Sequence, residues 1–198
     1  NIRTIKGNGF EVQFDMAQGT IHQLTYGDEV VIAAGGGPRL NAFRAFVSND
    51  NWCYQPWFQN GLHNLQHKAV DANTILNKDG SVKLTFTVVS QAPNAAQLQS
   101  KNGRYDSGIH TLIEHNDRPF GENDFKFTSN QIWTIYPDGS IELQSAITSS
   151  NPGVVLARLG YEMQVPAQLD QLAYYGRGPI DNYNDRKTGQ FIEQFKST

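Results

Sequence analysis

The sequence predicts an all-β fold, an antiparallel β-sandwich, formed as a single domain over residues 1–198. Three observations predict it: apolar and polar residues alternate along much of the chain, Asp-Gly turns separate the alternating runs, and helical periodicity is scarce. Alternation over four or more residues indicates a strand that buries one face. Strands of this kind, joined by short turns, usually pack as two antiparallel sheets.

Three runs alternate most clearly, residues 10–14, 82–88 and 141–147. An Asp-Gly turn precedes two of them, in NKDGS at 77–81 and in YPDGS at 136–140. Asp-Gly between two alternating runs is a strong hairpin signal. Each turn therefore predicts that the run before it pairs with the run after it.

The remaining segments are assigned from the same signals. DMAQGT at 15–20 predicts a turn after the first strand, and 57–69 is the one candidate for a short helix or helical turn. Residues 90–108 predict a long exposed connection, whereas 154–165 and 189–195 predict two more strands.

Composition excludes several classes of function. The chain is 38% hydrophobic, 11% aromatic and 18% charged, with a net charge of -3, which favours a packed core over disorder. It has no lysine or arginine run, so it lacks the electrostatic footprint of a nucleic-acid-binding protein. No basic amphipathic stretch and no run of 18 apolar residues occur, so neither membrane-surface attachment nor a membrane span is expected. The first residues lack the pattern of a signal peptide.

Cys53 is the only cysteine. A disulfide framework and a thiolate zinc cage each need several cysteines, so both are excluded within this chain. Cys53 lies between Trp52 and Tyr54, and we expect a buried, unreactive thiol.

The stretch YYGRGPIDNYNDR at 174–186 combines turn-forming residues with many hydrogen-bonding groups. It lies between two predicted strands, so we expect an irregular loop at a sheet end. Unusual φ angles at two glycines and a proline turn would set its path, and three polar residues would tie it internally. These loop-structuring residues are Gly176, Gly178, Pro179, Asn182, Asp185 and Arg186.

The same loop offers the groups that bind sugars, which are planar donors and acceptors together with aromatic faces. The candidates for the rim of a sugar site are Arg177, Asp181, Asn182 and Tyr183. A purely structural corner remains the alternative. A catalytic pair of Asp181 and Asp185 is a weaker alternative, because a four-residue spacing in an irregular loop fixes no separation between the carboxylates.

Residues 44–61 are the other dense stretch. Asn49, Asp50 and Asn51 offer oxygen ligands to a cation, but no spaced acidic partner follows, so no metal site is expected. The aromatic residues here are expected to pack in the core or against another domain; they are Trp52, Tyr54, Trp57 and Phe58. His63 and His67 would share one face of a helix, although a metal pair is the less favoured reading.

Three stretches, in this order, resemble one family. They are FDMAQGTIHQLTYGDEVVI at 14–32, GGGPRLNAFRAFVSNDN at 35–51 and YYGRGPIDNYNDRKTG at 174–189. The family is the C-terminal small-chain domain of β-galactosidases of glycoside hydrolase family two. In the second stretch Arg44, Asn49 and Asp50 match the family motif, and in the third Asp181 stands where the family usually has glutamate.

The resemblance implies a galactose-mutarotase-like supersandwich, present here as a truncated fragment. It also implies an accessory domain of a retaining β-galactosidase, an enzyme that hydrolyses terminal β-D-galactosides. The catalytic glutamates of that family lie on a barrel domain upstream, so this chain would have no catalytic residue of its own and would be inactive alone. Its partners would be that barrel, the other domains of the parent chain and the galactoside substrate, with a homo-oligomer as a further option.

The resemblance also bears on cofactors and location. The family often uses Mg and Na on other domains, so no cofactor and no metal are expected in this fragment. A bacterial enzyme is implied, with cytoplasm and periplasm both open. Two alternative functions remain. An aldose 1-epimerase would need a histidine acid and a carboxylate base, for which His110 or His115 with Glu114 are nominees. An independent carbohydrate-binding module would need exposed, coplanar aromatic rings.

Overall fold

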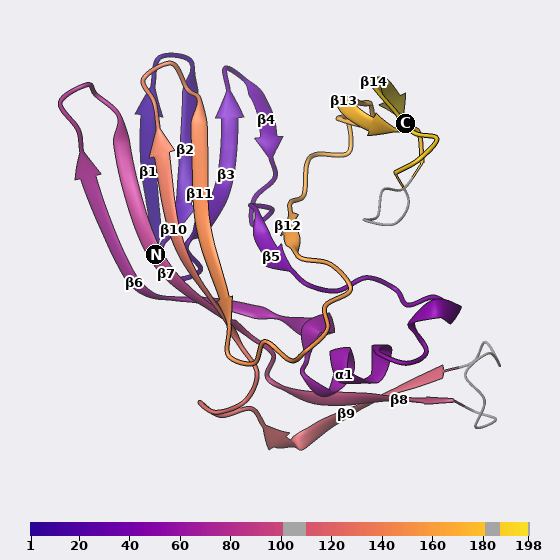
Figure 1. Cartoon of the computed structure of the whole chain (residues 1–198). Coiled ribbons are helices and arrows are strands. Elements are labelled where there is room, and N and C mark those ends of the chain that lie inside the picture. The colour runs from indigo at the N-terminus through magenta and orange to yellow at the C-terminus, as the bar shows by residue number, and fades with distance from the viewer. Residues whose placement is uncertain (101–109, 181–186, 198) are drawn as a thin grey trace. The chain divides into compact units, whose positions relative to one another are not determined.

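Two four-stranded antiparallel sheets pack face to face and form the sandwich that the sequence predicts (Figure 1). The computed structural model describes residues 1–100, 110–180 and 187–197. The first sheet has the order β1-β2-β3-β4, with the bounds Ile2–Gly7, Phe10–Asp15, Thr20–Tyr26 and Glu29–Ile32. The second has the order β11-β10-β7-β6, with the bounds Ile141–Ser149, Phe127–Ile135, Val82–Gln91 and Gln66–Leu76.

The core between these sheets is built from the alternating residues. Phe14 of β2 is fully buried and lies against Phe86 of β7 and Trp133 of β10, at ring-centroid distances of 6.4 and 5.4 Å. The other buried members of this core are Phe10, Val12, Ile21, Leu24, Ile32, Leu84, Val88 and Ile135. The strands predicted at 10–14, 82–88 and 141–147 are therefore confirmed as β2, β7 and β11.

Both predicted Asp-Gly hairpins are confirmed, between β6 and β7 and between β10 and β11. In the first, Gly80 has φ +83° and Asn77 donates its backbone N–H to Ser81 at 2.9 Å. Asp79 accepts from the Ser81 hydroxyl at 2.7 Å, which closes the turn from its side chain. The second turn repeats this arrangement, with Gly139 at φ +87°. A positive φ is the reason glycine occupies this turn position.

A second core lies beside the sandwich in the same unit. It collects the buried members Leu40, Ala42, Cys53, Tyr54, Trp57, Phe58, Leu62, Ala96, Leu98, Phe125 and Phe127. The elements around it are β5 (Arg39–Asn41), η1 (Ser48–Asp50), α1 (Tyr54–Gln59), η2 (Leu62–Asn64), β8 (Asn94–Ser100), β9 (His110–Pro119) and β12 (Gly160–Glu162).

Three sequence assignments are wrong in whole or in part in this region. The short helix or helical turn predicted within 57–69 is confirmed by the end of α1 and by η2, but the helix stops at Gln59, because Gly61 takes φ +69°, and His67 already belongs to β6. The exposed connection predicted over 90–108 contains strand β8, which pairs with β9 and buries Ala96 and Leu98. The strand predicted over 154–165 is reduced to the three residues of β12.

The chain divides into two compact units, Asn1–Gln164 and Val165–Thr198. The second unit contains a hairpin of β13 (Leu172–Gly178) and β14 (Phe191–Ser197), and this confirms a strand near the end of the chain. Residues 174–178 were predicted to be irregular, but they belong to β13 and pair with β14. The prediction of one domain over 1–198 stays a prediction.

Because His67 of β6 is largely buried, we expect the free energy of unfolding to depend on pH. Its Nδ1 lies 2.8 Å from the Ser90 hydroxyl, and burial lowers its pKa to about 4, with Arg39 acting in the same direction and Glu162 opposing. The folded state therefore favours the neutral ring, and the ring charges more readily in the unfolded chain. We expect the His67 contribution to be complete above the unfolded pKa of 6.5 and to be lost as the pH falls from 6.5 towards 4.

Urea denaturation at several pH values between 7.5 and 4 would measure this effect in the chain and in His67→Gln. The variant removes the titrating group, so the free energy of unfolding should fall more steeply with acidification in the unmodified chain. Parallel pH profiles for the two proteins would contradict the prediction.

Candidate functional site

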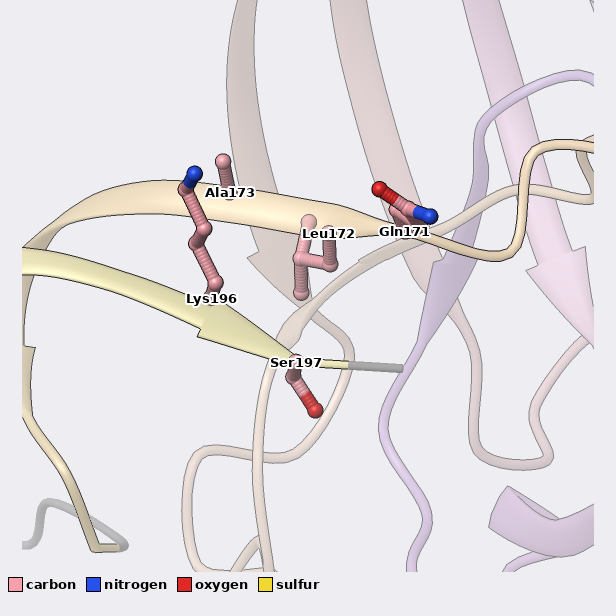
Figure 2. A pocket seen from close by; sticks show the side chains of 5 residues that line it. All are labelled: Gln171, Leu172, Ala173, Lys196 and Ser197. Atoms are coloured by element: carbon pink, nitrogen blue, oxygen red, sulfur yellow. The ribbon is translucent and has the colours of Figure 1, made fainter.

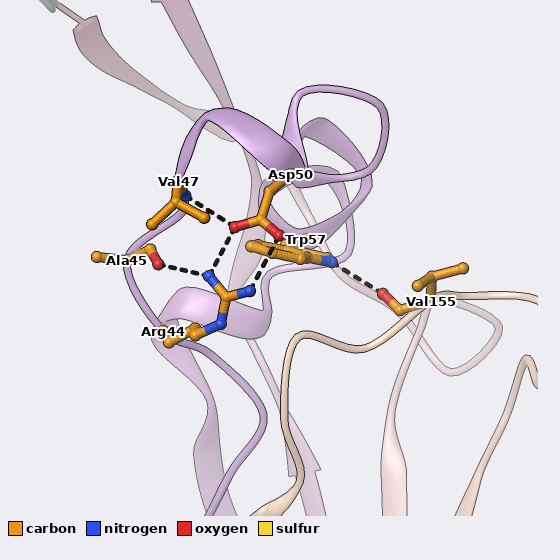
Figure 3. Close-up of polar contacts among 6 residues, drawn as sticks. All are labelled: Arg44, Ala45, Val47, Asp50, Trp57 and Val155. Atoms are coloured by element: carbon orange, nitrogen blue, oxygen red, sulfur yellow. Dashed lines mark hydrogen bonds and ion pairs between the residues drawn. The ribbon is translucent and has the colours of Figure 1, made fainter. Parts of the chain in front are cut away.

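The family-motif residues Arg44 and Asp50 form a two-pronged ion pair on the surface loop 44–52 (Figure 3). Arg44 Nη1 donates to Asp50 Oδ2 at 2.6 Å and Nη2 donates to Oδ1 at 2.9 Å. Arg44 Nη1 also donates to the Ala45 carbonyl at 2.9 Å, and the backbone N–H of Val47 donates to Asp50 Oδ2 at 2.8 Å. One carboxylate thus closes the loop through both a side chain and the backbone.

The ion pair rests on the second core. The Arg44 guanidinium carbon lies 5.6 Å from the centroid of the Trp57 ring, and Trp57 Nε1 donates to the Val155 carbonyl at 2.8 Å (Figure 3). Asp50 is only 8% exposed, so its charge depends on these donors. The hydrogen bond from Arg44 holds the pKa of Asp50 below its ordinary value, and the Val47 N–H adds to the effect while burial opposes it. Asp50 is therefore ionised and committed to loop structure.

The loop presents polar and aromatic side chains to the surface. Asn49 is exposed, and Trp52 is 74% exposed, so Trp52 is not in the core of this chain, and its packing against another domain stays a prediction. Tyr54, Trp57 and Phe58 are buried, as expected. The Asp50 carboxylate already accepts hydrogen bonds from Arg44 and from the backbone N–H of Val47. Asn49 and Asn51 therefore lack the free carboxylate that a cation site would require beside them. Among the residues that the structure describes, no cluster of three or more His, Cys, Asp or Glu side chains gathers that would hold a metal ion.

Cys53 is buried and unpaired beside this loop, as predicted. Burial raises the pKa of its thiol, and the charge of Asp50 acts in the same direction while Arg44 opposes it. A raised pKa keeps the thiol protonated and unreactive at neutral pH.

The other predicted site lies on the hairpin of the second unit. Arg177 of β13 donates from Nη1 to the Lys187 carbonyl at 3.4 Å. Gly176 and Gly178 also belong to β13, and neither has a positive φ, so the unusual backbone predicted for them is wrong. The remaining residues predicted here lie outside the described part of the chain: Asp181, Asn182, Tyr183, Asp185 and Arg186. Pro179 follows β13 through a cis peptide bond.

The structure gives Gly178 a packing reason instead. A Cβ at this position would lie 2.7 Å from Tyr174 Oη and 2.8 Å from Phe195 Cε2. The two rings pack across the hairpin with centroids 5.3 Å apart. A Cβ at Gly176 would meet Tyr174 at an ordinary contact distance of 3.6 Å. The two glycines therefore have different structural roles.

Gly178→Ala is expected to destabilise the β13–β14 hairpin by about 1–3 kcal/mol, because the added methyl group forces the two rings apart. Gly176→Ala is the matched control and should change the hairpin much less. Backbone hydrogen exchange in peptides covering 172–178 and 191–197 would measure both. Equal exchange rates in the two variants would contradict this explanation of Gly178.

A hollow of about 640 Å³ lies at the open end of the same hairpin (Figure 2). It is lined by Gln171, Leu172, Ala173, Lys196 and Ser197. These side chains are exposed, and the lining carries one amide, one ammonium and one hydroxyl group. This is an open surface and not an enclosed catalytic cavity.

The candidate histidines lie on three separate elements. His63 lies in η2 and His67 in β6, so the expected helical pair is wrong. His110, His115 and Glu114 all lie on β9, and the pairing of β9 with β8 is irregular directly after Glu114. His110 instead packs edge-on against Phe46, with centroids 5.2 Å apart.

One polar cluster was missed by the sequence analysis. Arg39 of β5 stands opposite Glu162 of β12 in the strand pair, and Asn41 donates from Nδ2 to Glu162 Oε2. The alternation of Arg39 and Asn41 in PRLN places both on one strand face, but Glu162 is 121 positions from Asn41. In the sequence, only the two-residue spacing of Arg39 and Asn41 indicated that their side chains share one strand face.

The fold is an all-β sandwich domain, and its surface loop 44–52 is closed by the Arg44–Asp50 ion pair. Within the described residues, no helix is long and apolar enough to cross a membrane. The family model described as "Beta galactosidase small chain" matches residues 6–198, and the chain belongs to this family.

Curated relatives agree with this family. The chain is 27% identical to a β-galactosidase of Halalkalibacterium halodurans, over 98% of this chain and 16% of that protein. It is 23% identical to the β-galactosidases of Psychromonas ingrahamii and Streptococcus thermophilus, over 92% and 98% of this chain and 16% of each of those proteins. The chain thus spans 16% of the length of these relatives.

Proposed function

We propose that this chain is the accessory β-sandwich domain of a retaining β-galactosidase, the enzyme that hydrolyses terminal β-D-galactosides, and that it is not catalytic alone. The observation that carries the proposal is the family match over residues 6–198. In this proposal the chain packs against the catalytic barrel and contributes a loop to the rim of the active site.

The carboxyl groups of the described residues support a non-catalytic role. A retaining glycosidase needs a general acid whose pKa is raised, so that it is protonated at the working pH. In the parts of the chain that the structure describes, every carboxyl group with a shifted pKa has it lowered by hydrogen bonds. These groups are Glu11, Asp50, Asp79, Asp138 and Glu142.

The hairpin of the second unit supports packing against other parts of a longer enzyme. A two-stranded hairpin is at best marginally stable alone in water, and large exposed apolar surfaces usually mark interaction sites. This hairpin and the residues beside it carry apolar side chains that are each more than half exposed: Leu172, Tyr175, Ile180, Phe191 and Ile192.

The candidates for the rim of the sugar site come from the end of β13 and from the sequence between β13 and β14. Loops carried by a rigid sheet often hold binding residues. Arg177, at the end of β13, leads into Asp181, Asn182 and Tyr183, which offer the carboxylate, amide and phenol groups that bind sugar hydroxyls.

Asp181→Ala in the complete enzyme that contains this chain is expected to lower kcat/KM by about ten- to a hundredfold, a loss typical of a misplaced substrate. In the isolated chain the same change should alter the free energy of unfolding by less than about 1 kcal/mol, as for a surface residue. Steady-state kinetics and urea denaturation measure the two effects. Asp170→Ala, at an exposed position of the same unit, is the control and should leave both unchanged.

The isolated chain itself should not hydrolyse a chromogenic β-galactoside. Turnover that persists through purification and disappears in Asp181→Ala or Asp185→Ala would overturn the accessory role. Unchanged enzyme kinetics in Asp181→Ala, together with unfolding of the isolated variant, would show that the loop is a structural corner.

A further inference from the structure

A small polar hollow lies beside the β5–β12 strand pair, in the first unit. Its volume is about 250 Å³, and it is lined by Gly36, Gly37, Arg39, Glu162, Met163 and Gln164. Pockets for drug-sized ligands begin at about 300 Å³, so this hollow suits a smaller molecule. Its lining combines a guanidinium, a carboxylate, an amide and a thioether.

The two charged residues of the hollow face each other but do not pair. Arg39 and Glu162 are directly opposite in the strand register, yet the ion pairs among the described residues are Lys6–Glu11 and Arg44–Asp50. Each charged group is instead fixed by a neutral partner. Arg39 Nε donates to Gln18 Oε1 at 3.1 Å, and Asn41 Nδ2 donates to Glu162 Oε2.

This arrangement leaves part of each charged group available. Within the described residues, Arg39 uses only Nε and Glu162 uses only Oε2, so two guanidinium nitrogens and one carboxylate oxygen keep their hydrogen-bonding capacity. Asn41 cannot turn away, because its Oδ1 accepts the backbone N–H of Phe43 at 2.7 Å. These hydrogen bonds orient the half-buried Arg39 guanidinium and the exposed Glu162 carboxylate before any ligand arrives, which lowers the entropic cost of binding.

The frame of the hollow is also fixed. Gln164 donates its backbone N–H to the Gly36 carbonyl at 2.7 Å, and Ala33 donates to the Gln164 carbonyl at 3.2 Å. A Cβ at Gly36 would lie 2.7 Å from that same Gln164 oxygen, so glycine permits the two backbones to approach. Met163 is 59% exposed and supplies an apolar surface next to the polar groups.

We propose that this hollow binds a monosaccharide ring. The charges of Arg39 and Glu162 cancel, which favours a neutral ligand over an ion. A guanidinium donates to ring and hydroxyl oxygens, a carboxylate accepts from hydroxyl groups, and the Gln164 amide does both. Met163 offers a surface to the C–H face of the ring. The choice of a sugar among neutral polar ligands rests on the proposed function. The hollow and the groups that line it are observed independently of that function.

The test uses the isolated chain and D-galactose as the probe, followed by two-dimensional amide NMR. Saturable shifts are expected for the amide signals of Gly36, Gly37 and Gln164, in the millimolar range. Glu162→Gln keeps the shape of the side chain and removes its charge. It should weaken binding by about tenfold or more, the effect of losing a hydrogen bond to a charged group. Arg39→Gln should do the same, and Glu142→Gln, at an exposed position on β11, is the control that should bind normally.

The other outcomes decide against the proposal. It is overturned if galactose causes no saturable shift, if Glu162→Gln binds as well as the unmodified chain, or if the acyclic polyol sorbitol binds equally. Tighter binding of L-serine than of galactose would show that Arg39 and Glu162 bind a zwitterion. That result would also overturn the proposal of a sugar ligand. Because binding is measured directly on the isolated chain, failure here leaves the accessory role in the enzyme untouched, and failure of the enzyme test leaves this result untouched.

Discussion

Asp50→Ala is expected to destabilise the chain by about 3 kcal/mol, because it removes the carboxylate that accepts both prongs of the half-buried Arg44 guanidinium. The loss has two parts. Asp50 accepts both prongs of Arg44, and it also accepts the backbone N–H of Val47. Urea denaturation followed by tryptophan fluorescence would measure it, since Trp57 lies beside the pair.

Glu11→Ala is the matched control, because it breaks the other ion pair of the described residues, Lys6–Glu11, which lies in solvent. Exposed pairs contribute little to stability, so its effect should be much smaller. A double-mutant cycle with Arg44→Ala would isolate the coupling between Arg44 and Asp50. Equal losses in Asp50→Ala and Glu11→Ala would contradict the structural role given to the pair.

The pH dependence of the Asp50→Ala effect follows from the lowered pKa of Asp50. The pair contributes above the unfolded pKa of 3.8, and its contribution is lost as the pH falls further, towards the folded pKa. The difference in stability between the chain and Asp50→Ala should therefore be constant near neutral pH and narrow in acid below 3.8.

Phe14→Ala should cost about 3–5 kcal/mol, the usual range for removing a buried phenylalanine. Phe14 has no exposed surface, and from the first sheet it packs against Phe86 and Trp133, which both belong to the second sheet. The cavity left behind has rigid strands on both sides, so the neighbours cannot collapse fully into it. The same denaturation experiment measures the loss.

Phe191→Ala removes the same ring from a position that is 63% exposed and serves as the control for Phe14→Ala. A change within about 0.5 kcal/mol is expected there, as for most surface substitutions. A loss at Phe14 no larger than the loss at Phe191 would show that the two sheets are not held together as described.

A substantial part of the fold follows from the sequence by itself. Residues 10–14, 82–88 and 141–147 form strands because the side-chain period of a strand is two, and each run alternates with that period. The two Asp-Gly turns form hairpins because glycine takes a positive φ and aspartate closes the turn with its own carboxylate. These are local properties, so a short window of sequence contains them.

Some residues of the candidate sites could also be predicted from the sequence. Arg44 and Asp50 are separated by only six positions, and a family motif marked both, but their pairing depends on the turn at η1. The burial of β8 was hidden, because Asn94–Ser100 is polar enough to resemble a connection until β9 pairs with it.

Tertiary structure alone decided the rest, because those features depend on residues far apart in the chain. Gly178 is required by the Phe195 ring across the hairpin and not by its own backbone conformation. Ala96 and Leu98 of β8 are buried in the second core only because β9, which begins at His110, pairs with β8. Glu162 meets Arg39 and Asn41 only when β12 returns to β5, so no local pattern of charge or hydrophobicity could bring that polar hollow together.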